Sequence, residues 1–462
     1  MSDRIVRELE VQKVCSGCVG EPYLAEMIKV DDHSAVCVCE YCGDTLPTVT
    51  LDWLSERCDI VFGNFYEATV NEIKVVDFGR DPDGDPLENC LADLLPDASQ
   101  DLVGDLARLM LEKIAYEEGD YGDPFYIRRN KIGLYFSSKW TRMSKSLKAE
   151  ARLCNPLAFR TLEEVFGPLA HDVTADGTPV IVLAGPGLPI SSLHRARVCG
   201  GFDELKKCIT HPEAQLGPVP IGQGGAGRMN AAGVSVFYGA TSDTVARAEV
   251  RPPVGGMVVI GQFDLIRELR LLDLDALSKI NVDSSLSLFN ERAVTEIGRR
   301  DFLAQLCEQL VVPIVPQDEG SSYVVTQAIA DYLAMHEELA IDGIIFRSAQ
   351  VHSDLSVASG KNVVLFHKAS KVVTADKDVS GSRNAEVIES DDDGDIQVSP
   401  RVEIDETKEV FLNLGPFDPD QRKPSLKIDL DSLTLHTIKA VEVIAETQPV
   451  VIARGPLDDF DF

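Results

Sequence analysis

The stretch from residue 224 to residue 251 constrains this chain most, because it reads as a loop, a strand and a capped helix in direct succession. Its opening Gly-Gly-Ala-Gly run lets backbone approach a ligand closely, since glycine has no side chain. A Val-x-Val-x-Tyr run that ends at Tyr238 alternates as on a strand. Ser242 or Asp243 can then cap a short helix that ends near Glu249.

Three polar residues in this stretch could converge on one cleft: Arg228 on the loop, Tyr238 on the strand and Glu249 at the helix end. Arginine offers a planar fork of donors that matches phosphate. Tyrosine offers a ring face to a flat heterocycle, and a carboxylate can hold a ribose hydroxyl or stabilise an oxocarbenium-like centre. The three suit a dinucleotide with a breakable N-glycosidic bond, of which NAD⁺ is the obvious candidate. The alternative is a surface pair of Arg228 and Glu249 beside a core Tyr238.

The sequence around these residues resembles that of the RES family, which is named for an Arg, a Glu and a Ser. The resemblance is carried by GRMNAAG, VSVFYGA and TVARAEV, then by SYVVTQAIADYL and by DGIIFRSAQ with NVVLF after it. The DGIIFRSAQ segment places Ser348, and an upstream LHRARV places Arg195. Met229 and Ala232 depart from the aromatic and the proline that are usual in the family. The resemblance covers about residues 190–370.

Membership of that family implies an ADP-ribosyltransferase-like fold and consumption of NAD⁺ by hydrolysis or phosphorolysis, or by transfer to a protein. It also implies a toxin that a separate antitoxin restrains. Carried over by position, Arg228 would bind phosphate or ribose, and Arg195 would add a phosphate contact. Tyr238 would stack on or orient the nicotinamide end. Glu249 would be the catalytic carboxylate, and Ser348 would hydrogen-bond the nicotinamide or its ribose.

Two CxxC pairs near the start of the chain form a second signal. Cys15 and Cys18 make the first pair, and Cys39 and Cys42 make the second. This spacing lets four thiolates surround one tetrahedral Zn²⁺, and an all-cysteine site is closed and structural. Cys37 could replace Cys39 as a ligand, and a set of reduced thiols without metal is the alternative. Similar knuckles precede a region described as HEPN-like in some longer RES proteins.

Composition limits the partners that the chain can have. The 75 acidic residues outnumber the 44 basic ones, and the formal net charge is −31. This balance argues against nucleic acid or an anionic membrane as a partner, while a few arginines inside a cleft still suffice for NAD⁺. The N-terminus lacks the apolar core of a signal peptide, so we expect a cytoplasmic protein. We also expect a homo-oligomer, with an antitoxin or a trigger protein as a separate partner.

The order of the segments predicts an α+β protein in five parts. These are a zinc-knuckle module (1–50), a helical, HEPN-like regulatory or oligomerisation domain (51–170), a RES domain with a split antiparallel sheet (171–370), an acidic flexible excursion (371–411) and a closing segment (412–462). The sequence FDLIRELRLLDL predicts a helix followed by a strand.

Four aromatic positions in the helical region are expected in the core rather than on a base-stacking surface; they are Tyr126, Tyr135, Phe136 and Trp140.

The function predicted from these observations is cleavage of the nicotinamide–ribose bond of NAD⁺. Protein ADP-ribosyltransfer by the same residues is one alternative. The other is a zinc-bearing scaffold or sensor whose RES domain is inactive. The sequence leaves open whether water, phosphate or a protein is the acceptor.

Overall fold

The structure is a computed structural model that describes most of the chain. The described residues are 2–71, 84–118, 124–129, 133–283, 286–311, 319–348, 350, 360–373, 383–392, 395–404, 420–441 and 447. They fall into two compact units, each built from several stretches of sequence. The first unit comprises 1–183, 221–234 and 269–349, and the second comprises 184–220, 235–268 and 350–462.

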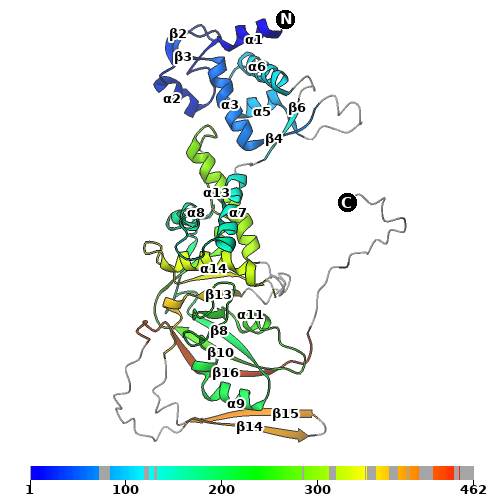
Figure 1. Cartoon of the computed structure of the whole chain (residues 1–462), viewed down its shortest axis with the longest axis vertical. Helices are drawn as coiled ribbons and strands as arrows, with labels where there is room; N and C mark the ends of the chain where they lie inside the picture. The colour runs from blue at the N-terminus through cyan, green and yellow to red at the C-terminus, as the bar shows by residue number, and fades with distance from the viewer. Residues whose placement is uncertain are drawn as a thin grey trace, which may run out of the picture. The chain divides into compact units, whose positions relative to one another are not determined.

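Among the described residues, the N-terminal part of the first unit combines five helices with two small sheets (Figure 1). The strands pair in the orders β1-β3-β2 and β4-β6-β5. The helices are α1 (Ser2–Glu10), α2 (Pro22–Val30), α3 (Leu51–Phe65), α5 (Leu87–Leu94) and α6 (Gln100–Glu118). The strands are β1 (Lys13–Cys15), β2 (Ala35–Val38), β3 (Thr45–Thr50), β4 (Tyr66–Asn71), β5 (Asp85–Pro86) and β6 (Pro124–Arg128). Between residues 51 and 128, the described part therefore contains three helices of this set together with the sheet β4-β6-β5.

Further helices and a short strand group complete the first unit. The strands β12, β11 and β7 lie in that order, and β11 pairs with β12 in parallel. Asn155 caps α8, because its side chain accepts hydrogen bonds from the backbone N–H groups of Leu157 and Ala158. The elements are α7 (Gly133–Ala149), α8 (Pro156–Phe166), η1 (Gly167–Ala170), β7 (Ile181–Ala184), β11 (Leu269–Asp273), α12 (Leu274–Leu277), α13 (Glu291–Val311), α14 (Glu319–Met335) and β12 (Gly343–Arg347).

The second unit is built on an antiparallel sheet. Five strands lie in the order β16-β10-β8-β9-β13, and each pair in that order is antiparallel. The helix α9 packs beside the β14–β15 hairpin (Figure 1). The elements are β8 (Ser192–Cys199), α9 (Phe202–Thr210), α10 (Pro212–Gln215), β9 (Phe237–Ala240), α11 (Asp243–Glu249), β10 (Met257–Leu265), β13 (Lys361–Leu365), η3 (His367–Ala369), β14 (Arg383–Asp392), β15 (Asp395–Ile404) and β16 (Leu426–Thr437).

These units confirm an α+β protein, and three local expectations change. The predicted helix in FDLIRELRLLDL is wrong, because β10 continues to Leu265 and β11 begins at Leu269. Phe263 and Leu265 are buried on one face of β10 with Asp264 exposed between them, which is the period of a strand. Tyr135 is 50% exposed and does not belong to the core. The acidic excursion predicted for 371–411 contains the β14–β15 hairpin where it is described, and its other parts lie outside the described residues.

Candidate functional site

The second unit holds Glu249 at the end of α11, a helix that packs against strands of the sheet. Ser242 caps this helix, because its hydroxyl accepts a hydrogen bond from the N–H of Val245 at 3.3 Å. Val245 and Ala246 lie on the buried side of this helix. The cap, the length and the end of the helix all agree with the sequence prediction. Glu249 itself is exposed, so its carboxylate is open to a ligand.

Asn362 holds the Glu249 carboxylate in place. Its Nδ2 donates a hydrogen bond of 2.7 Å to Oε1 of Glu249. Asn362 is 8% exposed and sits on β13, where it pairs with Ala240 of β9. A carboxylate at the C-terminal end of a helix faces the negative end of the helix dipole, so an amide donor offsets an unfavourable position.

Tyr238 lies on β9, next to the buried Phe237. It is 36% exposed, so the alternative of a core tyrosine is wrong. The strand begins at Phe237, later than the alternating run predicts. Gly239 lets β9 approach β8 closely, because a Cβ at this position would lie 3.2 Å from the carbonyl oxygen of His194.

Arg195 lies on β8 with its guanidinium carbon 5.1 Å from the centroid of the Phe237 ring. Burial, followed by the neighbouring charge of Arg197, lowers the pKa of this guanidinium to about 10. The side chain as a whole is half-buried, but its Nη1 atom is fully buried and lacks a hydrogen-bond partner among the described residues. A buried donor without a partner is costly, and an anionic ligand would satisfy it.

Arg228 belongs to the first unit, on a loop at residues 224–230 that we call the arginine loop. Its Nη1 donates to the carbonyl oxygen of Leu310 at 2.7 Å. Two side chains of α14 fix the loop backbone: the Thr326 hydroxyl donates to the carbonyl of Arg228, and Nε2 of Gln327 donates to the carbonyls of Gly227 and Asn230 at 2.9 and 3.0 Å. The helix α14 thus holds the backbone of the arginine loop, which was predicted to approach a ligand.

Ser348 also belongs to the first unit and follows β12 directly. It is half-buried. Its neighbour Arg347 pairs with Asp275 at 2.8 Å, which fixes the end of the strand. The structure therefore places Arg195, Tyr238 and Glu249 in the second unit and Arg228 and Ser348 in the first. A single cleft shared by all five stays a prediction.

Four cysteines of the first unit form a cluster that could bind zinc. The Sγ atoms of Cys15, Cys18, Cys39 and Cys42 all lie within 4.8 Å of one another. The Sγ atoms of Cys15 and Cys42 are 3.7 Å apart, close to the edge of about 3.8 Å that a tetrahedron with Zn–S bonds of about 2.3 Å has. Among the described residues, Cys37 on β2 lies outside the cluster, so Cys39 completes it.

Sequence reasoning missed the residues that hold the predicted ones. The sequence placed three of them in a predicted strand or helix but gave them no role; they are Asn362, Thr326 and Gln327. His194 was missed as well: it pairs with Ala240 across β8 and β9, and burial lowers its pKa. The only local signal was a polar residue beside an apolar run, as at the start of NVVLF.

Part of the chain matches a known protein family. Residues 193–386 match the RES domain family model. The match confirms the resemblance and extends it into β14. It includes all five predicted substrate and catalytic residues, and it leaves the cysteine cluster outside. No curated protein and no solved structure matched the chain. Among the described residues, no helix combines the length and apolar character that a membrane span needs.

Proposed function

We propose that the RES-matching segment of this chain cleaves the nicotinamide–ribose bond of NAD⁺. The observation that carries the proposal is the hydrogen bond between Asn362 and Glu249, because it aims a carboxylate from the end of α11 within the segment that matches the RES family. A carboxylate held in one position is what an oxocarbenium-like transition state needs.

In the proposed reaction, the bond between C1′ of the ribose and the nicotinamide nitrogen breaks, and its electron pair leaves with nicotinamide. Glu249 holds a ribose hydroxyl and stabilises the positive charge that develops on the ring. Water or phosphate then forms the new bond to C1′ and loses a proton. Tyr238, with its partly exposed ring on the neighbouring strand, offers a face on which the nicotinamide can stack.

The two arginines would hold the phosphates of the dinucleotide. The buried and unpartnered Nη1 of Arg195 supports this role, since a pyrophosphate oxygen would satisfy it. Arg228 supplies a second guanidinium on a loop that α14 holds in place. Binding at these remote groups can orient the bond that reacts. Ser348, directly after β12, is proposed to hydrogen-bond the nicotinamide end.

Zn²⁺ is proposed to bind the four-cysteine cluster in a structural role. All four donors are sulfur, so a bound ion would have no open position for substrate. The metal would hold the two knuckle loops together at the start of the chain and would take no part in NAD⁺ chemistry. A HEPN-like character of this region, an ADP-ribosyltransferase-like arrangement of the sheet and a separate antitoxin remain proposals from the family resemblance.

The test measures NAD⁺ and nicotinamide after mixing the purified full-length protein with NAD⁺, with and without phosphate. We expect loss of NAD⁺ with release of nicotinamide in the wild type, and at least about a hundredfold slower loss in Glu249→Gln and Arg228→Ala, as for removal of a transition-state contact. Glu268→Gln and Arg292→Ala change exposed residues of the same types and should keep the wild-type rate.

The products separate the alternatives. ADP-ribose alone indicates hydrolysis, and its phosphate derivative indicates phosphorolysis. Labelled NAD⁺ that marks a protein band indicates transfer to a protein. An intact rate in Glu249→Gln would overturn the proposed mechanism. The absence of NAD⁺ loss in the wild type, together with no NAD⁺ binding by calorimetry, would favour a scaffold with an inactive domain.

A further inference from the structure

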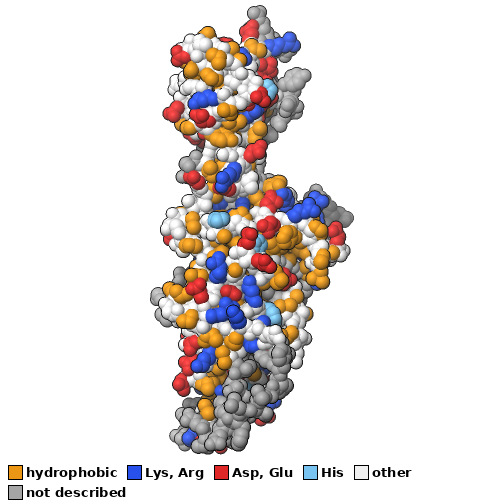
Figure 2. Space-filling view, turned by 90° about the vertical axis from the view of Figure 1, so that its left-hand side faces the viewer, with side chains coloured by type: hydrophobic (Ala, Val, Ile, Leu, Met, Phe, Trp, Pro, Cys, Tyr) orange, Lys and Arg blue, Asp and Glu red, His pale blue; other side chains and the backbone are white. Residues whose placement is uncertain are grey.

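The helix α7 is a local exception to the acidic character of the chain. Its residues Gly133–Ala149 carry four cations, Lys139, Arg142, Lys145 and Lys148, and no aspartate or glutamate. The whole chain has a formal net charge of −31. On the face that Figure 2 shows, lysine and arginine side chains stand among acidic ones.

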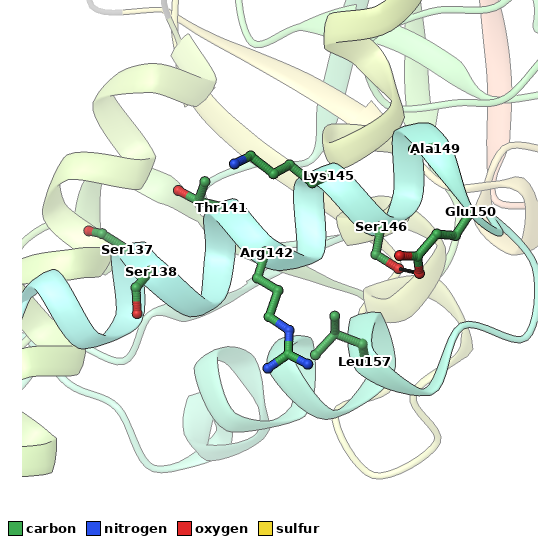
Figure 3. Close-up of a pocket in the computed structure, with 9 residues that line it drawn as sticks. All are labelled: Ser137, Ser138, Thr141, Arg142, Lys145, Ser146, Ala149, Glu150 and Leu157. Atoms are coloured by element: carbon green, nitrogen blue, oxygen red, sulfur yellow. Dashed lines mark hydrogen bonds between the residues drawn. The ribbon is translucent and has the colours of Figure 1, made fainter.

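An open groove of about 800 Å³ runs along the exposed face of this helix. We call it the α7 groove, and Figure 3 shows its lining side chains. Arg142 points from α7 toward Leu157 of α8, and Lys145 and Thr141 lie along the other edge of the same helix face (Figure 3). The lining residues are Ser137, Ser138, Thr141, Arg142, Lys145, Ser146, Ala149, Glu150 and Leu157.

The cations of the groove lack acidic partners. Arg142, Lys145 and the adjacent Lys148 are exposed, and none forms an ion pair or hydrogen bond with another described residue. Lys139, by contrast, pairs with Glu164 at 2.6 Å. The one acidic lining residue, Glu150, accepts a hydrogen bond of 2.7 Å from the Ser146 hydroxyl at the end of the groove. Two cations without an acidic partner, beside four hydroxyl groups, make a surface that suits phosphate.

An exposed aromatic ring lies at the N-terminal end of the same helix. Tyr135 is 50% exposed, and it precedes Ser138 and Arg142 by about one and two helical turns, which puts it on a neighbouring part of the helix surface. The Lys139 ammonium lies 4.1 Å from the centre of the Tyr135 ring. A cationic groove that carries an exposed aromatic ring is the arrangement with which proteins bind single strands, since the backbone follows the charges and an unstacked base covers the ring.

We propose that the α7 groove binds single-stranded nucleic acid through its phosphates, with one base stacked on Tyr135. An acidic peptide would satisfy the cations but would not use the exposed part of the tyrosine ring, which Lys139 leaves uncovered in part. The net charge of the whole chain predicts no nucleic-acid partner. Salt screens charges beyond about 8 Å at physiological ionic strength, so the local cations decide the contact. The proposal is independent of the NAD⁺ chemistry.

The test uses the full-length protein and fluorescein-labelled single-stranded RNA and DNA of mixed sequence, about ten nucleotides long, with anisotropy as the readout. Each phosphate contact contributes about −0.7 to the slope of log affinity against log salt. If Arg142 and Lys145 are the two phosphate contacts, a rise in salt from 50 to 200 mM should therefore weaken binding about sevenfold. The double variant R142Q/K145Q should lower the magnitude of that slope by about 1.4. Tyr135→Ala should weaken binding about tenfold at every salt concentration.

The matched control is the double variant K206Q/K207Q, which removes two exposed cations from α9 and leaves the net charge equal to that of the test variant. It should keep the wild-type affinity and slope. Equal losses in both double variants would overturn the proposal, because binding would then follow net charge alone. A poly-glutamate peptide that displaces the probe as well as unlabelled RNA does would also count against it, and so would an unchanged affinity in Tyr135→Ala. Thermal unfolding of each variant checks that the fold is intact.

Discussion

Asn362→Asp tests the positioning of Glu249 most directly. The substitution keeps the shape of the side chain but replaces the Nδ2 donor, 2.7 Å from Oε1 of Glu249, by a carboxylate oxygen. A hydrogen bond to a charged group contributes about 1.5 to 3 kcal/mol, which corresponds to about 10- to 150-fold in rate if the bond is needed in the transition state. Glu249 is exposed, and water can replace part of the lost bond, so we expect a loss near tenfold at neutral pH.

The pH profile separates positioning from simple damage. In Asn362→Asp two carboxyl groups at hydrogen-bond distance share one proton at low pH, which raises the apparent pKa of the pair. The acidic limb of the kcat/KM profile for NAD⁺ cleavage should therefore move to higher pH. Asn362→Ala removes the donor without adding a charge, so it should slow the reaction and move that limb less than Asn362→Asp does.

The assay follows NAD⁺ loss from pH 4 upward at saturating and limiting NAD⁺. Asn384→Asp makes the same chemical change at an exposed position of β14 and serves as the control. A wild-type rate and an unmoved acidic limb in Asn362→Asp would refute the positioning role. If the wild type consumes no NAD⁺, the proposed function fails first, and the substitution no longer bears on it.

The other predictions concern the metal, the pH dependence of stability and the arginine loop. Elemental analysis should find about one Zn²⁺ per chain, with loss in Cys18→Ser and retention in Cys37→Ser, since Cys37 lies outside the cluster. The side-chain hydrogen bond from Arg422 lowers the pKa of Asp420 to about 2, so this carboxylate stabilises the fold at neutral pH by at most about 2 kcal/mol. That contribution is complete above about pH 4 and is lost as pH falls toward 2, so the gap in thermal midpoint between wild type and Asp420→Asn should close over that range. Thr326→Val removes a donor to the arginine loop and should slow NAD⁺ cleavage, while Thr326→Ser keeps the hydroxyl and the rate.

Local signals predicted the parts of the site that the chain builds over a few residues. The cap at Ser242, the end of α11 at Glu249 and the cysteine knuckles each depend on neighbours in sequence or on a fixed ligand spacing. The partners that hold these groups are distant: Asn362 lies 113 residues after Glu249, and Thr326 lies 98 residues after Arg228. Periodicity cannot supply such pairs, because they form only when strands and helices pack.

The same argument explains why Tyr135 of α7 was wrongly predicted to lie in the core. A run of aromatic residues predicts burial on average, and Phe136 is indeed 2% exposed. Its neighbour Tyr135 lies about 100° away around the helix and is 50% exposed. Only the packing of α8, α13 and α14 against α7 decides which face is covered. The negative net charge of the whole chain gave no sign of the cations on the uncovered face of α7.

The hydrogen bonds described above for Glu249, Arg228 and the arginine loop come from within residues 193–386. Asn362 serves Glu249, and Leu310, Thr326 and Gln327 serve Arg228 and its loop. The four-cysteine cluster and the α7 groove both lie before residue 193. Substitutions there should therefore change metal content or nucleic-acid binding without changing the pH profile of NAD⁺ cleavage. A shift of that profile in Cys18→Ser or in R142Q/K145Q would show that the N-terminal part reaches the chemistry through a contact outside the described set.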